Sequence, residues 1–87
     1  MATSKNVIKD AILPAQVRAA RGLLGWSQDQ LAAASGVPKR TVARLELGEG
    51  TPQRRTLAAI RTALEAAGVI FVEENGEGPG VRLRKGS

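Results

Sequence analysis

Lysine and arginine side chains gather in the middle of the chain, where few acids accompany them. Between Pro38 and Arg61 there are six basic residues against two acids, and the whole chain has a formal charge of +5. The basic residues of this stretch are Lys39, Arg40, Arg44, Arg54, Arg55 and Arg61. Guanidinium and ammonium groups donate to phosphate and to the acceptor edge of guanine, so the stretch predicts a surface that attracts a polyanion, nucleic acid first and an anionic membrane second. On charge alone, a solvated charged face is the alternative.

The chain has no cysteine and no histidine. This excludes a disulfide framework, a zinc-thiolate site, a thiol nucleophile, an imidazole base and a serine–histidine–aspartate triad. The acids Glu73, Glu74 and Glu77 surround a glycine-rich turn, which favours a solubilising loop over an active site. Glycines 76, 78 and 80 open no helix, so they form no phosphate-binding fingerprint. The sequence therefore predicts a protein that is not an enzyme and uses no metal or cofactor.

These side chains belong to a chain of 87 residues, the length of one small domain. Twenty-one residues are Val, Ile, Leu or Phe, enough to build a globular core. The apolar run from Val69 to Val72 is far too short to span a membrane, and residues 1–14 lack the apolar segment of a signal peptide. We therefore expect a cytoplasmic protein without a membrane partner.

Helical spacing and capping residues predict four helices. Pro14 suits a first helical position, Ser27 followed by Gln30 forms a capping box, and Gly36 suits a helix end. Pro38 is expected to open the third helix. The expected helices cover residues 14–24, 28–35, 38–47 and 53–67, after an N-terminal lead-in over 1–13. Residues 1–12 of this lead-in are expected to be loosely ordered. The helical domain therefore spans 14–68.

The last part of the chain, residues 69–87, has a strand pattern and a turn composition. We expect strands over 69–73 and 81–85, so the fold class is mainly α, four helices followed by a C-terminal β-hairpin. Val69, Ile70, Phe71 and Val72 are apolar at four consecutive positions, so both faces of the first strand need cover. This predicts that the hairpin pairs with a second copy of the chain and forms a homodimer. The alternative is a hairpin folded back on its own helices.

Residues 28–46 have the spacing of two short helices joined by a tight turn. Ala32 is small where the second helix crosses the first, and Gly36 allows the positive φ of the turn. The wedge between the helices is filled by Leu31, Val37, Val42 and Leu45. This is the spacing of a helix-turn-helix, whose second helix lies in the major groove of DNA.

The runs 25–32, 35–38 and 41–48 resemble the Cro/repressor-type helix-turn-helix regulators, the XRE family. The resemblance covers residues 14–68 and implies a compact helical DNA-binding domain that acts as a dimer on a two-fold symmetric operator. The family commonly has a fifth helix, whereas strands are expected here after residue 68. The family's mode of dimerisation is therefore not carried over.

The resemblance also implies roles for individual residues. Basic side chains on the recognition helix would reach guanine, a threonine would meet thymine or phosphate, and the start of the fourth helix would hold phosphate. The implied DNA-binding residues are Gln28, Lys39, Arg40, Thr41, Arg44, Arg54 and Arg55. Arg21 and Glu46 match a structural pair, a partly buried salt bridge. Trp26 is expected in the core rather than as a base-stacking platform. Pro38 stands where the family often has Ser or Thr, which removes one side-chain cap.

Two functions follow from these features. The first is a sequence-specific regulator that binds double-stranded DNA. The second is an antitoxin or antiactivator, a protein-interaction module that binds another regulatory protein and also its own operator. A dedicated interaction module should lose partner binding on changes within 69–85 and should tolerate the loss of charge within 39–44.

Overall fold

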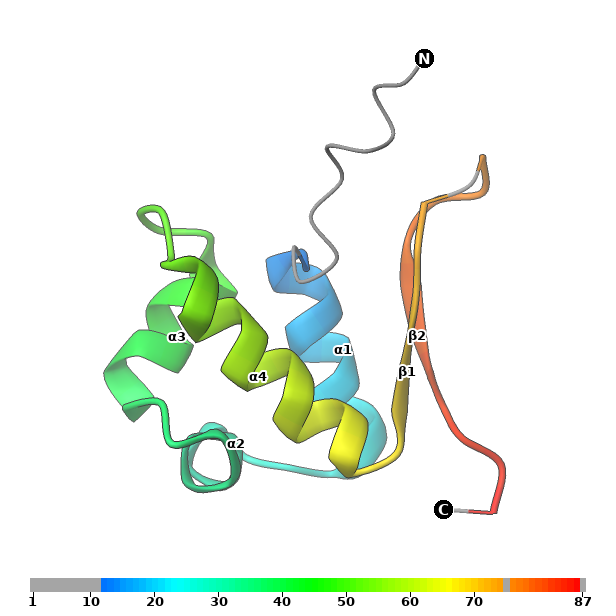
Figure 1. The fold of residues 1–87 in the computed structure, drawn as a ribbon, viewed down its shortest axis with the longest axis horizontal. Helices are drawn as coiled ribbons and strands as arrows, with labels where there is room; N and C mark the ends of the chain where they lie inside the picture. Colours follow the sequence, from blue (N-terminus) through cyan, green and yellow to red (C-terminus); the bar gives the residue numbers. More distant parts are fainter. Residues whose placement is uncertain (1–11, 75, 87) are drawn as a thin grey trace.

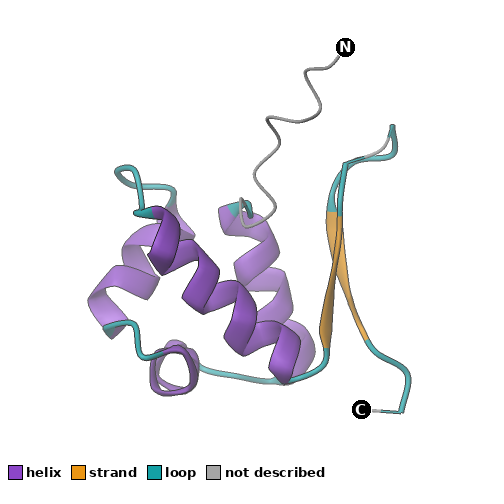
Figure 2. Ribbon diagram, viewed as in Figure 1, coloured by secondary structure: helices purple, strands orange, loops and turns teal. Residues whose placement is uncertain are grey.

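The computed structural model describes residues 12–74 and 76–86, which form four helices followed by a two-stranded hairpin (Figures 1 and 2). The helices are α1 (Pro14–Leu24), α2 (Gln28–Ser35), α3 (Lys39–Leu47) and α4 (Arg54–Ala66), and the strands are β1 (Val69–Val72) and β2 (Gly80–Leu83). The mainly α fold class with a C-terminal hairpin is confirmed. Figure 1 shows α3 and the hairpin at opposite ends of the molecule, with α1 and α4 between them.

Several element bounds differ from the expected ones by one or two residues. The third helix begins at Lys39, because Pro38 is extended (φ −59°, ψ 144°) and acts as the N-cap residue. Its carbonyl accepts hydrogen bonds from the backbone N–H groups of Thr41 and Val42, at 2.9 and 3.0 Å. The fourth helix is one residue shorter at each end than expected, and the first strand ends one residue early. The second strand covers 80–83 rather than 81–85.

Capping residues determine where the first helix of the helix-turn-helix, α2, begins and ends. The Ser27 hydroxyl accepts from the backbone N–H of Gln30 at 3.0 Å, and the Gln30 carboxamide oxygen accepts from the Ser27 N–H at 2.8 Å. These two bonds make the expected capping box. Gly36 ends α2 in the left-handed conformation with φ of 78°, which a residue with a Cβ rarely adopts.

The core lies where the four helices and one face of the hairpin meet. The expected wedge residues Leu31, Val37, Val42 and Leu45 are all buried, and Trp26 packs against this core from its edge. Ile12 is also buried in the core. The expectation of loose order is therefore wrong at Ile12, whose apolar side chain reaches the core just before α1. Residues 1–11 lie outside the described part of the chain.

The hairpin covers the core with one face only. The strands pair antiparallel with Val69 opposite Leu83, Phe71 opposite Val81 and Val72 opposite Gly80. Val69 and Phe71 are buried, whereas Ile70 and Val72 on the other face are half-buried. One face of β1 is thus covered by the chain's own helices, and the pairing of the hairpin with a second copy stays a prediction.

Candidate nucleic-acid interface

The recognition helix α3 has one buried face and one charged face. Val42 and Leu45 pack into the core, and this contact fixes how the helix is rotated. Lys39, Arg40 and Arg44 lie on the exposed side; the Lys39 and Arg44 side chains are 58% and 62% exposed. The three cations that the sequence assigned to reading DNA are therefore accessible together on one helix.

Two acids that the sequence analysis did not single out lie beside these cations. Asp29 of α2 lies 3.4 Å from the Lys39 ammonium, and Glu49 in the loop after α3 lies 3.8 Å from the Arg44 guanidinium. All four side chains are more than half exposed, so each pair contributes at most about 1 kcal/mol. The pairs therefore orient the two cations without preventing them from exchanging the acid for a phosphate or a base.

A second basic site lies at the start of α4. Arg54 and Arg55 are the first two residues of the helix and are both exposed. The N-cap residue Gln53 makes no side-chain hydrogen bond to the helix, so the backbone N–H groups of the first turn are not capped by it. An uncapped helix N-terminus flanked by arginines attracts an anion.

An open hollow of about 370 Å³ lies between this site and the end of α3. Its lining includes the side chains of Thr41, Arg44 and Thr56 together with the loop 49–53. Thr41 is half-buried in this wall rather than fully exposed beside Lys39 and Arg40. The hollow therefore links the exposed face of α3 to the start of α4, as a continuous polar surface.

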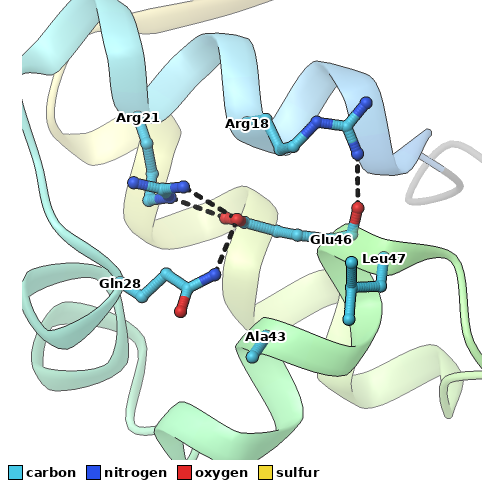
Figure 3. Close-up of a pocket in the computed structure, with 6 residues that line it drawn as sticks. All are labelled: Arg18, Arg21, Gln28, Ala43, Glu46 and Leu47. Carbon is cyan, nitrogen blue, oxygen red and sulfur yellow. Dashed lines mark hydrogen bonds and ion pairs between the residues drawn. The ribbon is translucent and has the colours of Figure 1, made fainter.

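Behind the recognition helix, Glu46 is the centre of a polar cluster (Figure 3). Arg21 of α1 binds its carboxylate with two nitrogens, Nε to Oε2 at 2.6 Å and Nη2 to Oε1 at 2.8 Å. Gln28 at the start of α2 donates from Nε2 to Oε1 at 2.9 Å, and Arg18 donates to the backbone carbonyl of Glu46. The expected Arg21–Glu46 pair is present and joins α1 to α3, and Gln28 adds α2 to the cluster.

These contacts decide the charge state of the cluster. Burial by itself raises the pKa of Glu46, but hydrogen bonds from Arg21 and Gln28 and the charges of Arg21 and Arg18 outweigh it, so the pKa is lowered. The hydrogen bond to Glu46 raises the pKa of Arg21. Both side chains are therefore ionised at neutral pH, and Glu46 holds α3 against α1 and α2.

Gln28 is part of the polar cluster as well as a residue that the sequence assigned to DNA binding. Its amide nitrogen is bound within the cluster, and its side chain is half-buried on the wall of an open hollow of about 490 Å³. Leu47, 72% exposed, lies on the same wall. Gln28 thus connects the structural cluster to the surface, and its contact with DNA stays a prediction.

Two further polar residues were not found from the sequence. Arg18 lies three residues before Arg21, a spacing that puts both on one face of α1 and was a usable signal. Gln16 is buried; its carboxamide oxygen accepts from the Leu13 N–H at 2.8 Å and its nitrogen donates to the Gly80 carbonyl at 3.0 Å. No local pattern indicates the second bond, because it joins residues far apart in the chain.

Two short helices around a tight turn, with a basic face on the second, define a helix-turn-helix DNA-binding domain. The chain belongs to the HTH_3 helix-turn-helix family, of Cro/C1 (XRE) type, whose family model matches residues 17–66. It is a DNA-binding regulator of that family, which is typically non-enzymatic. A comparison with curated proteins finds no match to the chain. No helix in residues 12–74 or 76–86 has the length and apolar character needed to cross a membrane.

Proposed function

We propose that the protein is a transcriptional regulator that recognises a specific sequence of double-stranded DNA, and that a homodimer of it binds an inverted-repeat operator. The observation that carries this proposal is the exposed basic face of α3 on a buried apolar back. An α-helix of this kind fits the major groove, where arginine donates two bonds to O6 and N7 of guanine and lysine reaches the same acceptors.

Within this proposal the residues divide into two groups. Lys39, Arg40 and Arg44 contact base edges, with Thr41 beside them on the half-buried side of α3. Arg54 and Arg55 at the start of α4 bind phosphate and set the register of the domain along the groove. Gln28 contacts the backbone of the DNA from the start of α2. This division makes sequence preference a property of α3 and general affinity a property of α4.

The dimer of the proposal forms through the hairpin, residues 69–87. Val69 and Phe71 lie in the core of the chain itself, so Ile70, Val72 and the strand edges remain for a second copy. A two-stranded hairpin is marginally stable alone and has two open edges, which supports pairing between copies. Removal of the whole hairpin is a poor test of this pairing, because it also removes Val69 and Phe71 from the core.

Selection from a random library of double-stranded DNA tests the proposal directly. The full chain should enrich an inverted repeat, whereas a K39A/R40A/R44A variant with unchanged circular dichroism should enrich none. The affinity for the selected site should fall as salt is added. For each phosphate neutralised, log Kd should rise by ~0.9 per unit of log salt. No enrichment by the wild-type chain, or a flat salt dependence, would contradict the proposal.

A further inference from the structure

The two ends of the hairpin carry opposite charges. The turn end has three acids and no base, and the end beside the C-terminus has three bases and no acid. The acids are Glu73, Glu74 and Glu77, and the bases are Arg82, Arg84 and Lys85. All six residues are exposed, and no ion pair joins the two groups among the described residues. Each hairpin is therefore negatively charged at its turn end, called the tip below, and positively charged at the end beside the C-terminus, called the base.

The edge of β2 is open to a further strand. The sheet has only two strands in the described part of the chain, so β2 pairs with β1 on one side alone. The Arg84 N–H donates to the Gly68 carbonyl at 2.7 Å, which continues the ladder beyond Leu83. Because hydrogen-bonding direction alternates along an antiparallel strand, the backbone groups of Val81 and Leu83 point to the open edge. Leu83 also keeps 38% of its surface exposed.

Two-fold symmetry fixes the direction in which two such edges can pair. Two copies of one strand related by a two-fold axis run antiparallel, so the tip of each hairpin lies beside the base of the other. At the β2 edge this places Glu77 of each copy against Lys85 of the other, at both ends of the contact, with Glu73 and Glu74 one strand further away because they follow β1. At the β1 edge it would place Glu73 and Glu74 beside residues 66–68, which carry no charge. The charge pattern is thus complementary only at the β2 edge.

We propose that a second copy of this chain docks antiparallel on the β2 edge. The negatively charged turn end of each hairpin then lies against the positively charged C-terminal end of the other. The inference rests on the dimer of the proposed function and specifies its interface. The hairpins then form one four-stranded sheet across the dimer. The charges select the β2 edge and the register. The N–H and C=O groups of Val81 and the N–H of Leu83 supply the hydrogen bonds, because Leu83 lies opposite Pro79, which accepts a hydrogen bond but has no N–H to donate.

The charges also select a register. With Val81 at the two-fold axis, Arg82 lies opposite Gly80 of the other copy, and Lys85 lies opposite Glu77. With Arg82 at the axis, two arginines would face each other directly, which is destabilising. The register centred on Val81 is therefore the expected one.

Paired charge reversals test the interface without DNA. The E73K/E77K variant has a positive tip and base, and the R84E/K85E variant has a negative tip and base; Glu74 is kept because it accepts bonds from the N–H groups of Gly76 and Gly78. By light scattering, the wild type should have twice the 9.1 kDa mass of one chain, and each variant alone the mass of one chain. An equimolar mixture should regain the doubled mass, because each tip then meets an opposite base.

The matched control is R54E/R55E, which makes the same change in charge as R84E/K85E but far from the hairpin, and it should stay dimeric. A monomeric wild type would overturn the inference, since the charges would then only protect a strand edge from aggregation. Homodimers of both reversed variants would overturn it as well. Both results are independent of DNA, so the DNA-binding part of the proposed function stands or falls separately by the library selection.

Cross-linking tests the register, since the chain has no cysteine of its own. The single variants E77C and K85C should form a disulfide-linked heterodimer when mixed and oxidised, and little cross-link when oxidised separately. Efficient cross-linking of E77C to itself would show that the tips meet, and would overturn the antiparallel arrangement.

Discussion

Glu46 of α3 is a carboxylate with only 3% of its side chain exposed, and the groups bound to it belong to the two other helices α1 and α2. Two bonds from Arg21 and one from Gln28 satisfy it, and no buried side-chain nitrogen or oxygen of the described residues lacks a partner. A buried ion pair often contributes little net stability, but loss of one partner leaves an uncompensated charge. The cluster therefore makes the orientation of α3 sensitive to single substitutions far from its DNA-binding face.

Replacement of Arg21 by alanine should destabilise the fold strongly. The side chain is only 21% exposed, and its removal leaves Glu46 buried with Gln28 as its one side-chain partner. We expect a loss of about 3 kcal/mol in the free energy of unfolding, measured by urea denaturation. The exposed Arg55→Ala variant is the control and should change stability by less than about 0.5 kcal/mol. An unchanged midpoint for Arg21→Ala would contradict the structural role of the pair.

The same cluster should make stability depend on acid. The pKa of Glu46 is lower in the folded state than its ordinary value of 4.5, so the unfolded chain takes up a proton first as the pH falls. The stabilising contribution of Glu46 is fully present above about pH 4.5 and is lost as the pH falls through its folded-state pKa. Glu46→Gln should therefore be less stable than the wild type at pH 7, and this difference should shrink toward about pH 3. A difference independent of pH would contradict the assignment.

Substitutions on the two basic surfaces should separate base reading from phosphate binding. Arg40→Ala or Arg44→Ala should cost about 1–3 kcal/mol on the best operator and relax the preference at particular base pairs. Arg55→Ala should weaken binding to all sequences alike and lower the salt slope by ~0.9 for each phosphate that the variant no longer neutralises. Quantitative binding to a panel of single-base operator variants distinguishes these outcomes. A uniform loss of affinity from the α3 variants would mean that their side chains bind phosphate instead.

At the scale of elements, the hairpin is held to the helices by a few defined contacts. Gln16 bridges the start of α1 to the first residue of β2, and Phe71 packs under the Arg61 guanidinium, which lies 4.9 Å from the ring centre. Arg61 also pairs with Glu65 at 3.0 Å on the same helix. The inner face of the hairpin is thus part of the domain core, and only its outer face and edges are available for assembly.

A comparison of Gln16 with Gln30 measures what the contact between α1 and the hairpin contributes to stability. Each is the third residue of its helix, and each carboxamide oxygen accepts a backbone N–H three residues earlier, but only Gln16 is buried and reaches Gly80. Gln16→Ala should cost ~0.5–1.5 kcal/mol more than Gln30→Ala, because only Gln16 loses a further hydrogen bond, the one that it donates to the Gly80 carbonyl. Thermal unfolding of the two variants measures the difference. Equal losses would show that the link to the hairpin contributes nothing.

At the scale of the whole molecule, the DNA-binding and assembly surfaces are well separated. The recognition helix and the hairpin lie at opposite ends of the long dimension in Figure 1. A dimer formed through the hairpins therefore keeps both α3 faces free. It also fixes the distance and the angle between them, so the two half-sites should be separated by a whole number of DNA turns.

This geometry predicts a strict spacing within the operator. Insertion of five base pairs at its centre rotates one half-site by about half a turn, since B-DNA repeats every 10–10.5 base pairs. A rigid dimer can then engage only one half-site, and we expect the affinity to fall at least about tenfold, as the loss of 1.4 kcal/mol or more implies. The measurement is titration of the wild-type chain on both operators, with a single half-site as the control. Equal affinity for the two operators would show that the domains are not rigidly coupled.

Much of this fold follows from local chemistry and was predicted from the sequence. Ser27 with Gln30 and the left-handed Gly36 set the bounds of α2, and the spacing of Leu31, Val42 and Leu45 set the inward face of the helix-turn-helix. The same periodicity left Lys39, Arg40 and Arg44 on the outer face of α3. These features depend on residues within about one or two turns of each other, so they can be recognised without knowing the fold.

The tertiary structure alone decided which polar groups meet across elements and which strand face is covered. Gln16 and Gly80, or Arg18 and the Glu46 carbonyl, are far apart in the chain, and their contact depends on how α1 packs against β2 and α3. The apolar run at Val69 to Val72 showed that both faces need cover but could not say which face the helices take. A periodic pattern specifies a direction around one element, whereas a contact between two elements depends on their relative placement, which only the packed core determines.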